Sequence, residues 1–261
     1  MKRVKLTIAY DGTSYHGWQI QPNAVTVEGV INEKLSELCQ EEIKVIGASR
    51  TDAGVHAYGN VAVFDTNSSI PAERFPLALN RMLPTNIRVQ SGIEVPGDFH
   101  PRHCDSIKTY QYHIFNSRIP IPTNRLYSYH FHWDLDLEAM KQAAQYFIGE
   151  HDFKSFCSTK TQVQDTTRTI YSLELEQKGE EILLTIRGNG FLYNMVRIIT
   201  GTLLQVGTGH YKPEQIKEMI DSKDRTKAGA CAPAHGLFLV GIAYPELEKT
   251  LSQKTEREET C

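Results

Sequence analysis

Cysteine is scarce in this sequence, and its spacing excludes two common uses of the residue. Five cysteines are scattered over 261 residues, and none of them forms a Cys-x-x-Cys pair. An odd number of isolated thiols is typical of a reducing compartment and offers no zinc-ligand spacing. No two histidines have the His-x-x-x-His or His-Glu-x-x-His spacing of a helical metal site. We therefore expect no disulfide framework and no metal.

The sequence also lacks a marked excess of charge and a long hydrophobic run. The net charge is −3, so the chain is not a polybasic binder, and any nucleic-acid site must be a local basic face. No apolar run approaches the roughly 20 residues of a membrane span. The first residues lead directly into a strand-like alternation, so we expect no signal peptide and a cytoplasmic protein.

The chain is long enough for one large domain or two small ones. Since 40% of its residues are hydrophobic, each domain could bury a core of its own. Hydrophobic periodicity predicts the order strand, helix, strand, strand, helix, strand in the first part. Thr26 is the expected N-cap of the first helix, and Pro71 lies near the start of the second. The predicted elements are residues 4–10, 27–38, 43–46, 60–65, 71–83 and 87–95.

The second part repeats this order of elements. Asp136 is the expected N-cap of its first helix, which Gly149 ends, and a hairpin turns at residues 178–179. A strongly apolar helix and a buried final strand follow. The predicted elements are residues 108–115, 136–148, 172–176, 182–187, 195–206, 213–222 and 237–243.

These patterns predict an α+β fold built from two ferredoxin-like, or RRM-like, halves. The halves would share one mixed, largely antiparallel sheet, with helices on one side and a central cleft on the other. We expect an N-terminal α/β subdomain at residues 1–105 and a C-terminal one at residues 106–245. The charged segment 246–261 is predicted to be a frayed, disordered tail.

One stretch between two apolar runs, residues 47–57, concentrates unusual chemistry. It places an arginine, an aspartate and a histidine among glycines and alanines. Gly47 and Gly54 permit backbone angles that other residues resist, and the small side chains let a bulky ligand approach the main chain. Asp52 is therefore expected to be a carboxylate presented on a tight turn, with Arg50 two residues away.

Two further positions combine polar chemistry with an apolar pattern. Alternation along the strand places Lys108, Tyr110 and Tyr112 on one face. Tyr110 is either a packing residue with a locally bonded hydroxyl or an aromatic floor on which a base stacks. Arg197 stands in the first turns of an apolar helix, where it either extends to solvent or pairs with a buried carboxylate. The residues alone leave both choices open.

These motifs resemble those of the TruA family of tRNA pseudouridine synthases. The string Arg-Thr-Asp-Ala-Gly-Val-His at residues 50–56 is similar to the family's catalytic motif, and Ser49 stands where the family usually has glycine. Residues 108–112 are similar to its Arg-x-Tyr-x-Tyr motif, with Lys108 replacing the arginine. Residues 191–197 are similar to its Phe-Leu-x-x-Met-Val-Arg motif. The resemblance extends from residue 4 to about residue 244, through similar segments at residues 10–19, 151–153, 168–170 and 232–239.

The resemblance implies an enzyme that isomerises uridine to pseudouridine at positions 38, 39 and 40, in the anticodon stem-loop of tRNA. It implies that Asp52 is catalytic, that Tyr110 stacks on the base, and that Arg197 pairs with Asp52 and favours its ionised form. Arg50 is expected to fill or prop the space that the flipped base vacates. The resemblance also implies a homodimer, with one tRNA lying across both subunits.

This reaction breaks the C1′–N1 bond, turns the base and forms a C1′–C5 bond. Because nothing is oxidised and no group is lost, we expect no cofactor. An ionised Asp52 would attack C1′, add to C6 or remove a proton from C2′, and the sequence leaves these three routes open. His56 is expected to hold the loop by hydrogen bonds.

RNA binding would require a basic face although the whole chain is slightly acidic. As a set, basic side chains would bind the backbone with a marked salt dependence. The candidates are Lys2, Arg3, Arg102, Lys108, Arg125, Lys154, Lys160, Arg168, Arg225 and Lys227.

Two other classes of function compete with this interpretation. A non-catalytic RNA-binding module of ferredoxin-like fold would bind tRNA without changing it, but the aromatic-rich strand motif of such modules is absent. An aspartate-dependent hydrolase or phosphotransferase usually needs a metal site or a phosphate loop, and the sequence has no Gly-x-x-x-x-Gly-Lys.

Overall fold

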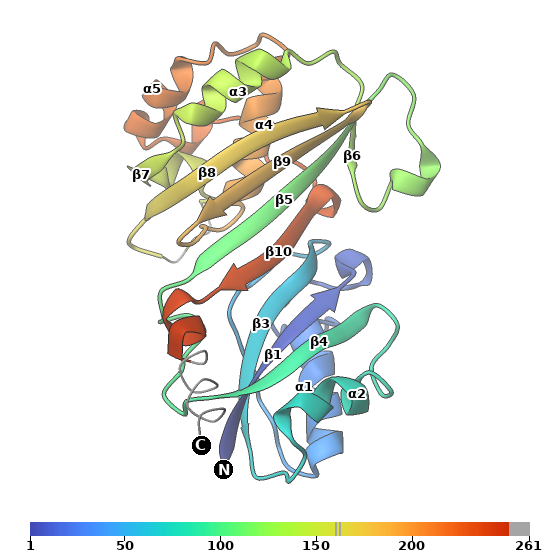
Figure 1. Ribbon diagram of the computed structural model, residues 1–261. Coiled ribbons are helices and arrows are strands. Elements are labelled where there is room, and N and C mark those ends of the chain that lie inside the picture. The colour runs from blue at the N-terminus through green and yellow to red at the C-terminus, as the bar shows by residue number, and fades with distance from the viewer. Residues whose placement is uncertain (160, 162, 251–261) are drawn as a thin grey trace.

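The computed structural model describes residues 1–159, 161 and 163–250, and its centre is one large mixed sheet (Figure 1). Eight strands follow one another across the sheet in the order β4-β1-β3-β10-β5-β9-β8-β7, while β2 pairs with β3 and β6 with β5. The strands are β1 (Lys2–Tyr10), β2 (Ile46–Gly47), β3 (His56–Thr66), β4 (Ile87–Val95), β5 (Ile107–Asn116), β6 (Tyr129–Phe131), β7 (Gly149–Asp152), β8 (Thr167–Lys178), β9 (Glu181–Gly188) and β10 (Leu237–Ala243).

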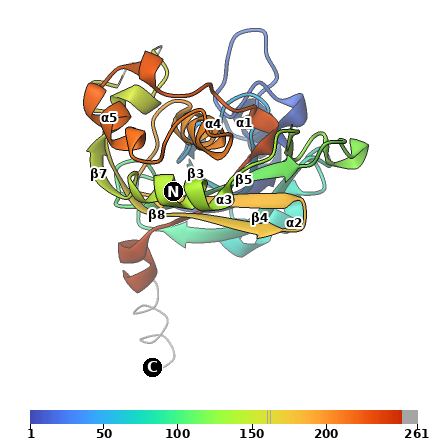
Figure 2. The same cartoon turned by 90° about the horizontal axis from the view of Figure 1, so that it is seen from above.

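The longest helices lie on one face of this sheet. Figures 1 and 2 show α1 behind the strands of the first part and α4 behind those of the second, with α3 and α5 near α4. An α+β architecture with one mixed sheet is therefore confirmed. The helices are α1 (Val27–Cys39), α2 (Phe75–Leu79), α3 (Leu137–Gln145), α4 (Met195–Gly207) and α5 (Gln215–Ser222).

Local sequence signals explain where several elements begin. The Thr26 side chain accepts a hydrogen bond from the backbone of Gly29 at the start of α1, and Asp136 accepts one from Ala139 at the start of α3. Both are N-caps that satisfy an otherwise unpaired amide. In α4, apolar residues surround most of the helix and eleven of its thirteen residues are buried. The predicted positions of these three helices are confirmed, although α3 ends earlier than expected.

The sheet is largely antiparallel, and β10 joins its two parts. β10 runs antiparallel to β5 but parallel to β3, where Phe238 lies opposite His56 and Leu239 opposite Ala57. His56 is the first residue of β3 and follows the loop that carries Asp52. The last strand of the chain therefore reaches the junction at which this loop ends.

The sheet buries apolar side chains on both faces. The larger cluster lies on the helix side and includes Leu6, Tyr110 and Ile199. A smaller cluster on the other face packs Val63 against Tyr244. Leu247 also belongs to this smaller cluster, and residues 245–250 are helical, so the prediction of a frayed tail is wrong for residues 246–250. Its remainder, residues 251–261, lies outside the described residues.

Two predicted elements are shorter in the structure because side chains replace backbone pairing. The prediction of a strand at residues 43–46 is wrong over most of its length, since the side chains of Ser36 and Asn32 accept hydrogen bonds from the amides of Ile43 and Val45. The helix predicted at residues 71–83 begins as a 3₁₀ turn and ends at Leu79. The next residue, Asn80, bonds both backbone groups of Val89 in β4. The short strands β6 and β7 were not predicted.

Candidate active site

The loop between β2 and β3 carries Asp52 and is held from outside by the segment that follows β1. The amide of Trp18 donates to the carbonyl of Thr51 (3.0 Å), and the amide of Gly54 donates to Tyr15 (3.4 Å). A Cβ on Gly47 would lie 2.2 Å from the indole nitrogen of Trp18, so only glycine fits there. The motif at residues 10–19 therefore supports the Asp52 loop by backbone contact.

A buried hydrogen-bond network also fixes the loop that carries Asp52. The hydroxyl of Tyr10 lies 2.7 Å from Oγ1 of Thr51, and Asn60 donates both to Tyr10 (3.3 Å) and to the carbonyl of Ser49 (3.0 Å). All four residues are buried. Buried polar groups that are fully paired hold a unique geometry, so the residues on both sides of Arg50 are fixed.

Asp52 and Arg197 meet although 145 residues separate them. Nη1 of Arg197 donates to Oδ2 of Asp52 over 3.2 Å, and their side chains are 18% and 20% exposed. The guanidinium also donates from Nε to the carbonyl of Ala232 (2.7 Å) and from Nη1 to Oδ1 of Asn194 (2.9 Å). The structure thus brings together the acid and the base that the sequence places in distant motifs.

The environment of Asp52 raises the pKa of its carboxyl above the ordinary value. Burial is the largest cause, because it disfavours the charged form, while the charge and hydrogen bond of Arg197 lower the pKa. Arg197 therefore favours ionisation in the expected direction, but burial outweighs it. A carboxylate with a raised pKa is a stronger base and nucleophile than one at the surface.

Tyr110 lies beside this pair, on the helix side of β5. Its hydroxyl is 2.8 Å from Oγ of Ser49, and its ring meets Phe191 edge to face, with centroids 5.2 Å apart. Burial raises the pKa of Tyr110 to about 12, and the charge of Asp52 adds to this effect. Tyr110 therefore stays protonated near neutral pH. Its hydroxyl is locally bonded, as the packing interpretation expects, and it lies within reach of the charge of Asp52.

The prediction that the cleft lies on the face opposite the helices is wrong for these residues. Arg197 belongs to α4, and Tyr110 shares the helix-side core with Leu239 of β10. The site therefore lies on the helix side, where α4 and the loop after β2 approach each other. Strand alternation could not reveal this, because it distinguishes two faces without saying which one a helix covers.

Arg50 is exposed next to the carboxylate. No hydrogen bond or ion pair joins it to any residue that the structure describes. Its guanidinium is therefore available to a ligand.

Two residues at this site were missed from the sequence. In the sequence Ser49 is only a small departure from glycine, yet its hydroxyl bonds Tyr110, which glycine could not do. Asn194 has a left-handed backbone (φ 63°) at the start of α4, and its amide oxygen accepts from Arg197 rather than capping the helix. The spacing of three residues between Asn194 and Arg197 was the available signal, because such residues are neighbours on a helix.

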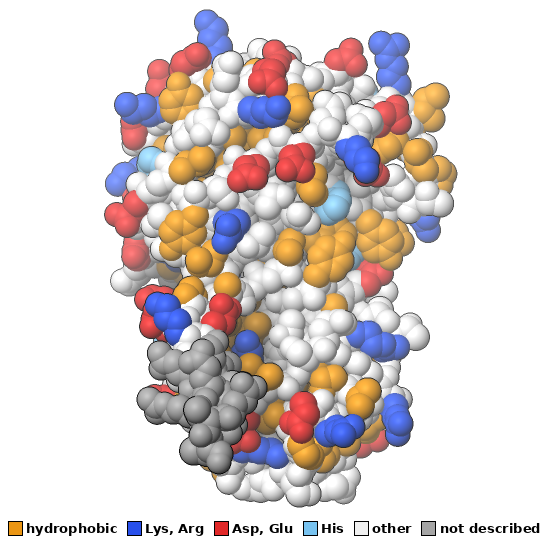
Figure 3. All heavy atoms as spheres, in the orientation of Figure 1, with side chains coloured by type: hydrophobic (Ala, Val, Ile, Leu, Met, Phe, Trp, Pro, Cys, Tyr) orange, Lys and Arg blue, Asp and Glu red, His pale blue; other side chains and the backbone are white. Residues whose placement is uncertain are grey.

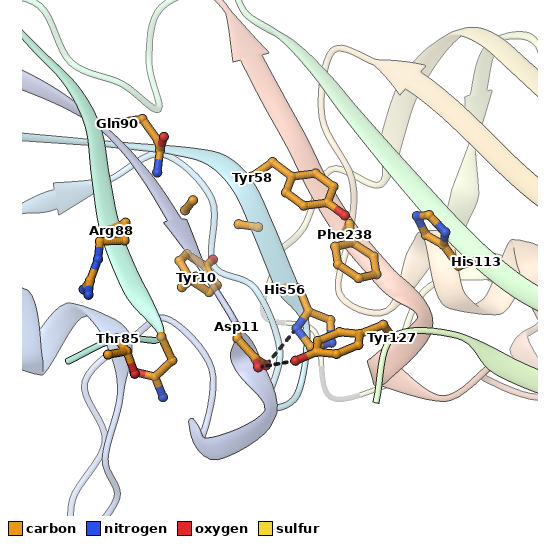
Figure 4. A pocket seen from close by; sticks show the side chains of 13 residues that line it. Tyr10, Asp11, His56, Tyr58, Thr85, Arg88, Gln90, His113, Tyr127 and Phe238 are labelled. Atoms are coloured by element: carbon orange, nitrogen blue, oxygen red, sulfur yellow. Dashed lines mark hydrogen bonds and ion pairs between the residues drawn. The ribbon is translucent and has the colours of Figure 1, made fainter. Parts of the chain in front are cut away.

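His56 holds the loop as expected, on the other face of the sheet. Its Nδ1 accepts from the amide of Gly12 (3.1 Å), and Nε2 donates to the carbonyl of Leu126 (3.0 Å). Figure 4 shows its ring beside Asp11 and Tyr127, whose hydroxyl donates to the Asp11 carboxylate (2.8 Å). Burial lowers the pKa of His56, so the imidazole is neutral near pH 7. A cavity of about 380 Å³ lies here, and Asp52 does not line it.

The structure separates the ten candidate RNA-binding cations into groups. Arg3 is engaged in an ion pair with Asp65 (2.6 Å), which makes it a poor candidate. Arg102, Lys108 and Arg168 line one cavity of about 640 Å³. Lys160 lies outside the described residues.

The described residues offer neither a metal cluster nor a membrane span. Within residues 1–159, 161 and 163–250, no three His, Cys, Asp or Glu side chains gather to hold an ion. In the same part of the chain, no helix has both the length and the apolarity to cross a bilayer.

The chain is similar to known proteins over most of its length. A family model described as tRNA pseudouridine synthase matches residues 6–103 and 143–245. The tRNA pseudouridine synthases A of Caldicellulosiruptor bescii and Acetivibrio thermocellus are 48% and 49% identical over 244 residues, which is 94% of this chain and all of each relative. A solved H/ACA ribonucleoprotein bound to a substrate RNA containing 2′-deoxyuridine is 12% identical over 90% of this chain and 45% of that chain. Its TM-score of 0.35 is too low to support an argument.

Proposed function

Because the chain belongs to the tRNA pseudouridine synthase family, which isomerises uridine in tRNA, we propose that it modifies positions 38, 39 and 40 of the anticodon stem-loop, with Asp52 as its catalytic carboxylate. The observation that carries the role of Asp52 is its 3.2 Å ion pair with Arg197, and Tyr110 lies within reach of the charge of the Asp52 carboxylate. A polar pair of this kind, partly buried and next to an aromatic ring, suits a flipped base.

The isomerisation exchanges one bond to C1′ for another. The C1′–N1 bond breaks, the uracil turns, and C5 bonds to C1′; C5 then loses its proton and N1 gains one. No electron acceptor is required. The site therefore has to supply a nucleophile or base, a pocket for the freed uracil, and donors that support its negative charge.

Asp52 serves the first of these needs in its ionised form. It attacks C1′, adds to C6 or deprotonates C2′, and its raised pKa favours each of these steps. Arg197 favours the charged form of the carboxylate and orients it, since its guanidinium is itself held by Ala232 and Asn194.

Tyr110 and Arg50 have roles that depend on the flipped nucleotide. The Tyr110 ring stacks on the uracil and keeps it close while it turns, a contact worth roughly 1–3 kcal/mol. Arg50, which is exposed and without a partner among the described residues, fills the space left in the RNA stack. An Arg50→Ala variant that kept full activity on tRNA would contradict this role.

Tritium release from tRNA labelled at C5 of uridine tests the proposal. Wild-type chain should release tritium, because C5 loses its hydrogen only when the new carbon–carbon bond forms there. Asp52→Ala should release none while still binding tRNA, and mapping of the product should place pseudouridine at positions 38 to 40. Retention of tRNA by the wild type without release would support the non-catalytic RNA-binding module instead.

We also propose that each part of the sheet is a ferredoxin-like unit, with the boundary at residues 105–106. The order β4-β1-β3-β2 with α1 and α2, and the order β10-β5-β9-β8 with α3 and α4, both support this proposal. The first part runs strand, helix, strand, strand, helix, strand, and the second follows the same order with β6, β7 and α5 added. Expression of residues 1–105 alone tests the boundary, since an independent unit should give dispersed amide signals in a nuclear magnetic resonance spectrum.

A homodimer is proposed as the working form, and the sheet face without helices supports it. Tyr58 is 52% exposed there and stacks on Phe238 (5.1 Å), and Tyr127 is 43% exposed. Figure 3 shows hydrophobic side chains gathered over the middle of this face. A monomer rarely leaves such a patch uncovered. Sedimentation of the wild type and of Tyr58→Arg tests the proposal: the wild type should be a dimer and the variant should dissociate.

A further inference from the structure

The cavity of about 640 Å³ lies where the segment between β4 and β5 passes the ends of β8 and β9. Arg102 comes from this segment, Lys108 from the start of β5, and Arg168 from the start of β8. The Arg168 side chain lies against Gly190, since a Cβ built there would be 3.5 Å from its Nε, an ordinary contact distance. Three cations therefore converge on one hollow from three separate elements.

The described part of the chain does not neutralise these cations. None of them forms an ion pair with a described residue, and Asp105 is the one carboxylate in the cavity lining. Nη1 of Arg168 donates to backbone carbonyls, and Nζ of Lys108 donates to the carbonyl of Ala48 (3.1 Å). Burial, followed by the charges of Arg168 and Arg102, lowers the pKa of Lys108 to about 8. Among the described lining residues, three cations therefore stand against one carboxylate, and the cavity has a net positive charge.

The cavity shares a wall with the candidate active site. Phe191, one of its lining residues, meets the Tyr110 ring edge to face. Lys108 bonds Ala48, and the next residue, Ser49, bonds Tyr110. An anion in the cavity would therefore lie close to a base stacked on Tyr110.

We propose that this cavity binds a backbone phosphate of the tRNA strand that carries the target uridine, an inference that rests on the proposed function. A phosphodiester is an anion with two free oxygens. The planar guanidinium of Arg168 can donate to both oxygens, while the ammonium of Lys108 adds a point charge. The phosphate supplies the ion-pair partner that the described residues do not, and it fixes the strand next to the Asp52 loop. It is a contact to the backbone, so it positions the RNA without reading its sequence.

Lys108 makes this contact dependent on pH. A bound phosphate favours the ammonium form, so affinity is highest below pH 8 and falls as the free lysine loses its proton above that value. The charged and titratable groups that face it across the cavity are Arg168 and Tyr171 from β8, and Arg102, His103, Cys104 and Asp105 from the preceding segment. Arginine at position 108 would remain charged throughout this range.

The first experiment measures the dissociation constant of the full chain for tRNA at several salt concentrations. Arg168→Gln is compared with Lys178→Gln, because both residues belong to β8 and Lys178 is exposed at its other end. Arg168→Gln should weaken binding about tenfold and reduce the slope of log K against log salt by about one. Lys178→Gln should leave both quantities near the wild-type values. Thermal unfolding verifies that each variant is folded.

The second experiment compares wild type with Lys108→Arg from pH 7 to pH 9. Both chains carry Cys104→Ser, so that the thiol in the cavity lining is absent from both. Wild-type affinity for tRNA should fall severalfold over this interval, and Lys108→Arg should show no such fall. A titration with inorganic phosphate separates the two sources of the anion, since a site for free phosphate would saturate without any effect of Arg168→Gln on tRNA binding.

Three results would overturn the inference. The first is an Arg168→Gln variant that binds tRNA like Lys178→Gln. The second is an equal pH dependence of tRNA affinity with lysine and with arginine at position 108. The third is a cavity that saturates with inorganic phosphate while Arg168→Gln has no effect on tRNA binding. Pseudouridine formation by the wild type is measured in the same tRNA samples. Turnover together with any of these results means that the phosphate site fails while the proposed function stands, and absence of turnover means that the proposed function fails.

Discussion

Two neighbouring regions of this molecule bring cations into partly buried positions, and they differ in one respect. At the candidate active site, Arg197 faces Asp52 at 3.2 Å and is held by two further hydrogen bonds. In the adjacent cavity, Lys108 and Arg168 face each other's charge, and no ion pair joins either to a described residue. In the first region the cation is neutralised by a carboxylate of the chain, and in the second we propose that a ligand neutralises the cations.

The difference explains what each region contributes to function. A charge paired within the chain is fixed before the substrate arrives, which suits a group that acts on the reacting atoms. Unpaired cations raise the energy of the free protein and are relieved by an anion, which suits a site for the RNA backbone. Substitutions in the two regions should therefore have different, and in one case opposite, consequences.

The largest effect is expected at the paired carboxylate. Asp52→Asn keeps the shape and removes the charge, so turnover should fall by about a thousandfold or more, while the affinity for tRNA changes little. Tritium release and filter binding measure the two quantities. A parallel loss of both turnover and binding would show that the pair holds the RNA rather than acting on it.

The next effect is expected at the partner of this carboxylate. Arg197→Met leaves Asp52 without the cation that lowers its pKa, so the pKa of Asp52 should rise further. If the ionised form is the active one, the acidic limb of kcat/KM moves to higher pH and the maximum falls about a hundredfold. Urea unfolding should show a loss of about 1–3 kcal/mol, because a partly buried carboxylate has lost its partner.

Arg187→Met is the matched control for this change, since Arg187 is exposed on β9. It should leave the pH profile and the free energy of unfolding unchanged. An unchanged acidic limb in Arg197→Met would assign that limb to a group other than Asp52.

In the cavity, removal of a cation should raise the free energy of unfolding instead of lowering it. The pKa of Lys108 is lowered from 10.5 to about 8 in the folded chain, so its charged form destabilises the fold below pH 8, and this cost disappears as pH rises towards 10.5. Lys108→Met should therefore raise the free energy of unfolding by about 1 kcal/mol at pH 7, after allowance for the lost bond to Ala48. The gain should vanish near pH 10.5. Urea unfolding at both pH values measures it, and a loss of stability at pH 7 would contradict the unpaired state of this lysine.

The smallest effect is expected at the residue that links the two regions. Ser49→Gly removes the bond to Tyr110 and gives the loop more backbone freedom, which should cost about 1 kcal/mol in unfolding and a few-fold in turnover. Tyr110→Phe removes the same bond while it keeps the ring and the loop backbone. Equal losses in turnover for the two variants would assign the effect to the hydrogen bond alone.

Most elements of the fold are predictable from local patterns, and the exceptions have specific causes. The strands at residues 87–95 and 237–243 have the predicted bounds, because alternation or a continuous apolar run defines them. The strand predicted at residues 43–46 does not form over most of its length, because the side chains of Ser36 and Asn32 on α1 accept hydrogen bonds from its amides. Side-chain bonds of this kind join elements that a local pattern treats separately, so periodicity could not anticipate them.

The sequence by itself determined the chemistry available to this protein: a carboxylate on a glycine-rich turn, an aromatic strand, an arginine on an apolar helix, and motifs that identify the family. Only the tertiary structure decided which of these groups meet. Asp52 and Arg197 pair across 145 residues because β10 joins the two parts of the sheet, and burial then raises the pKa of Asp52 in spite of its partner. The absence of an ion-pair partner for Lys108 and Arg168 among the described residues was equally a tertiary result. Charge neutralisation depends on distances of a few ångströms, and such distances between segments far apart in sequence are set by packing alone.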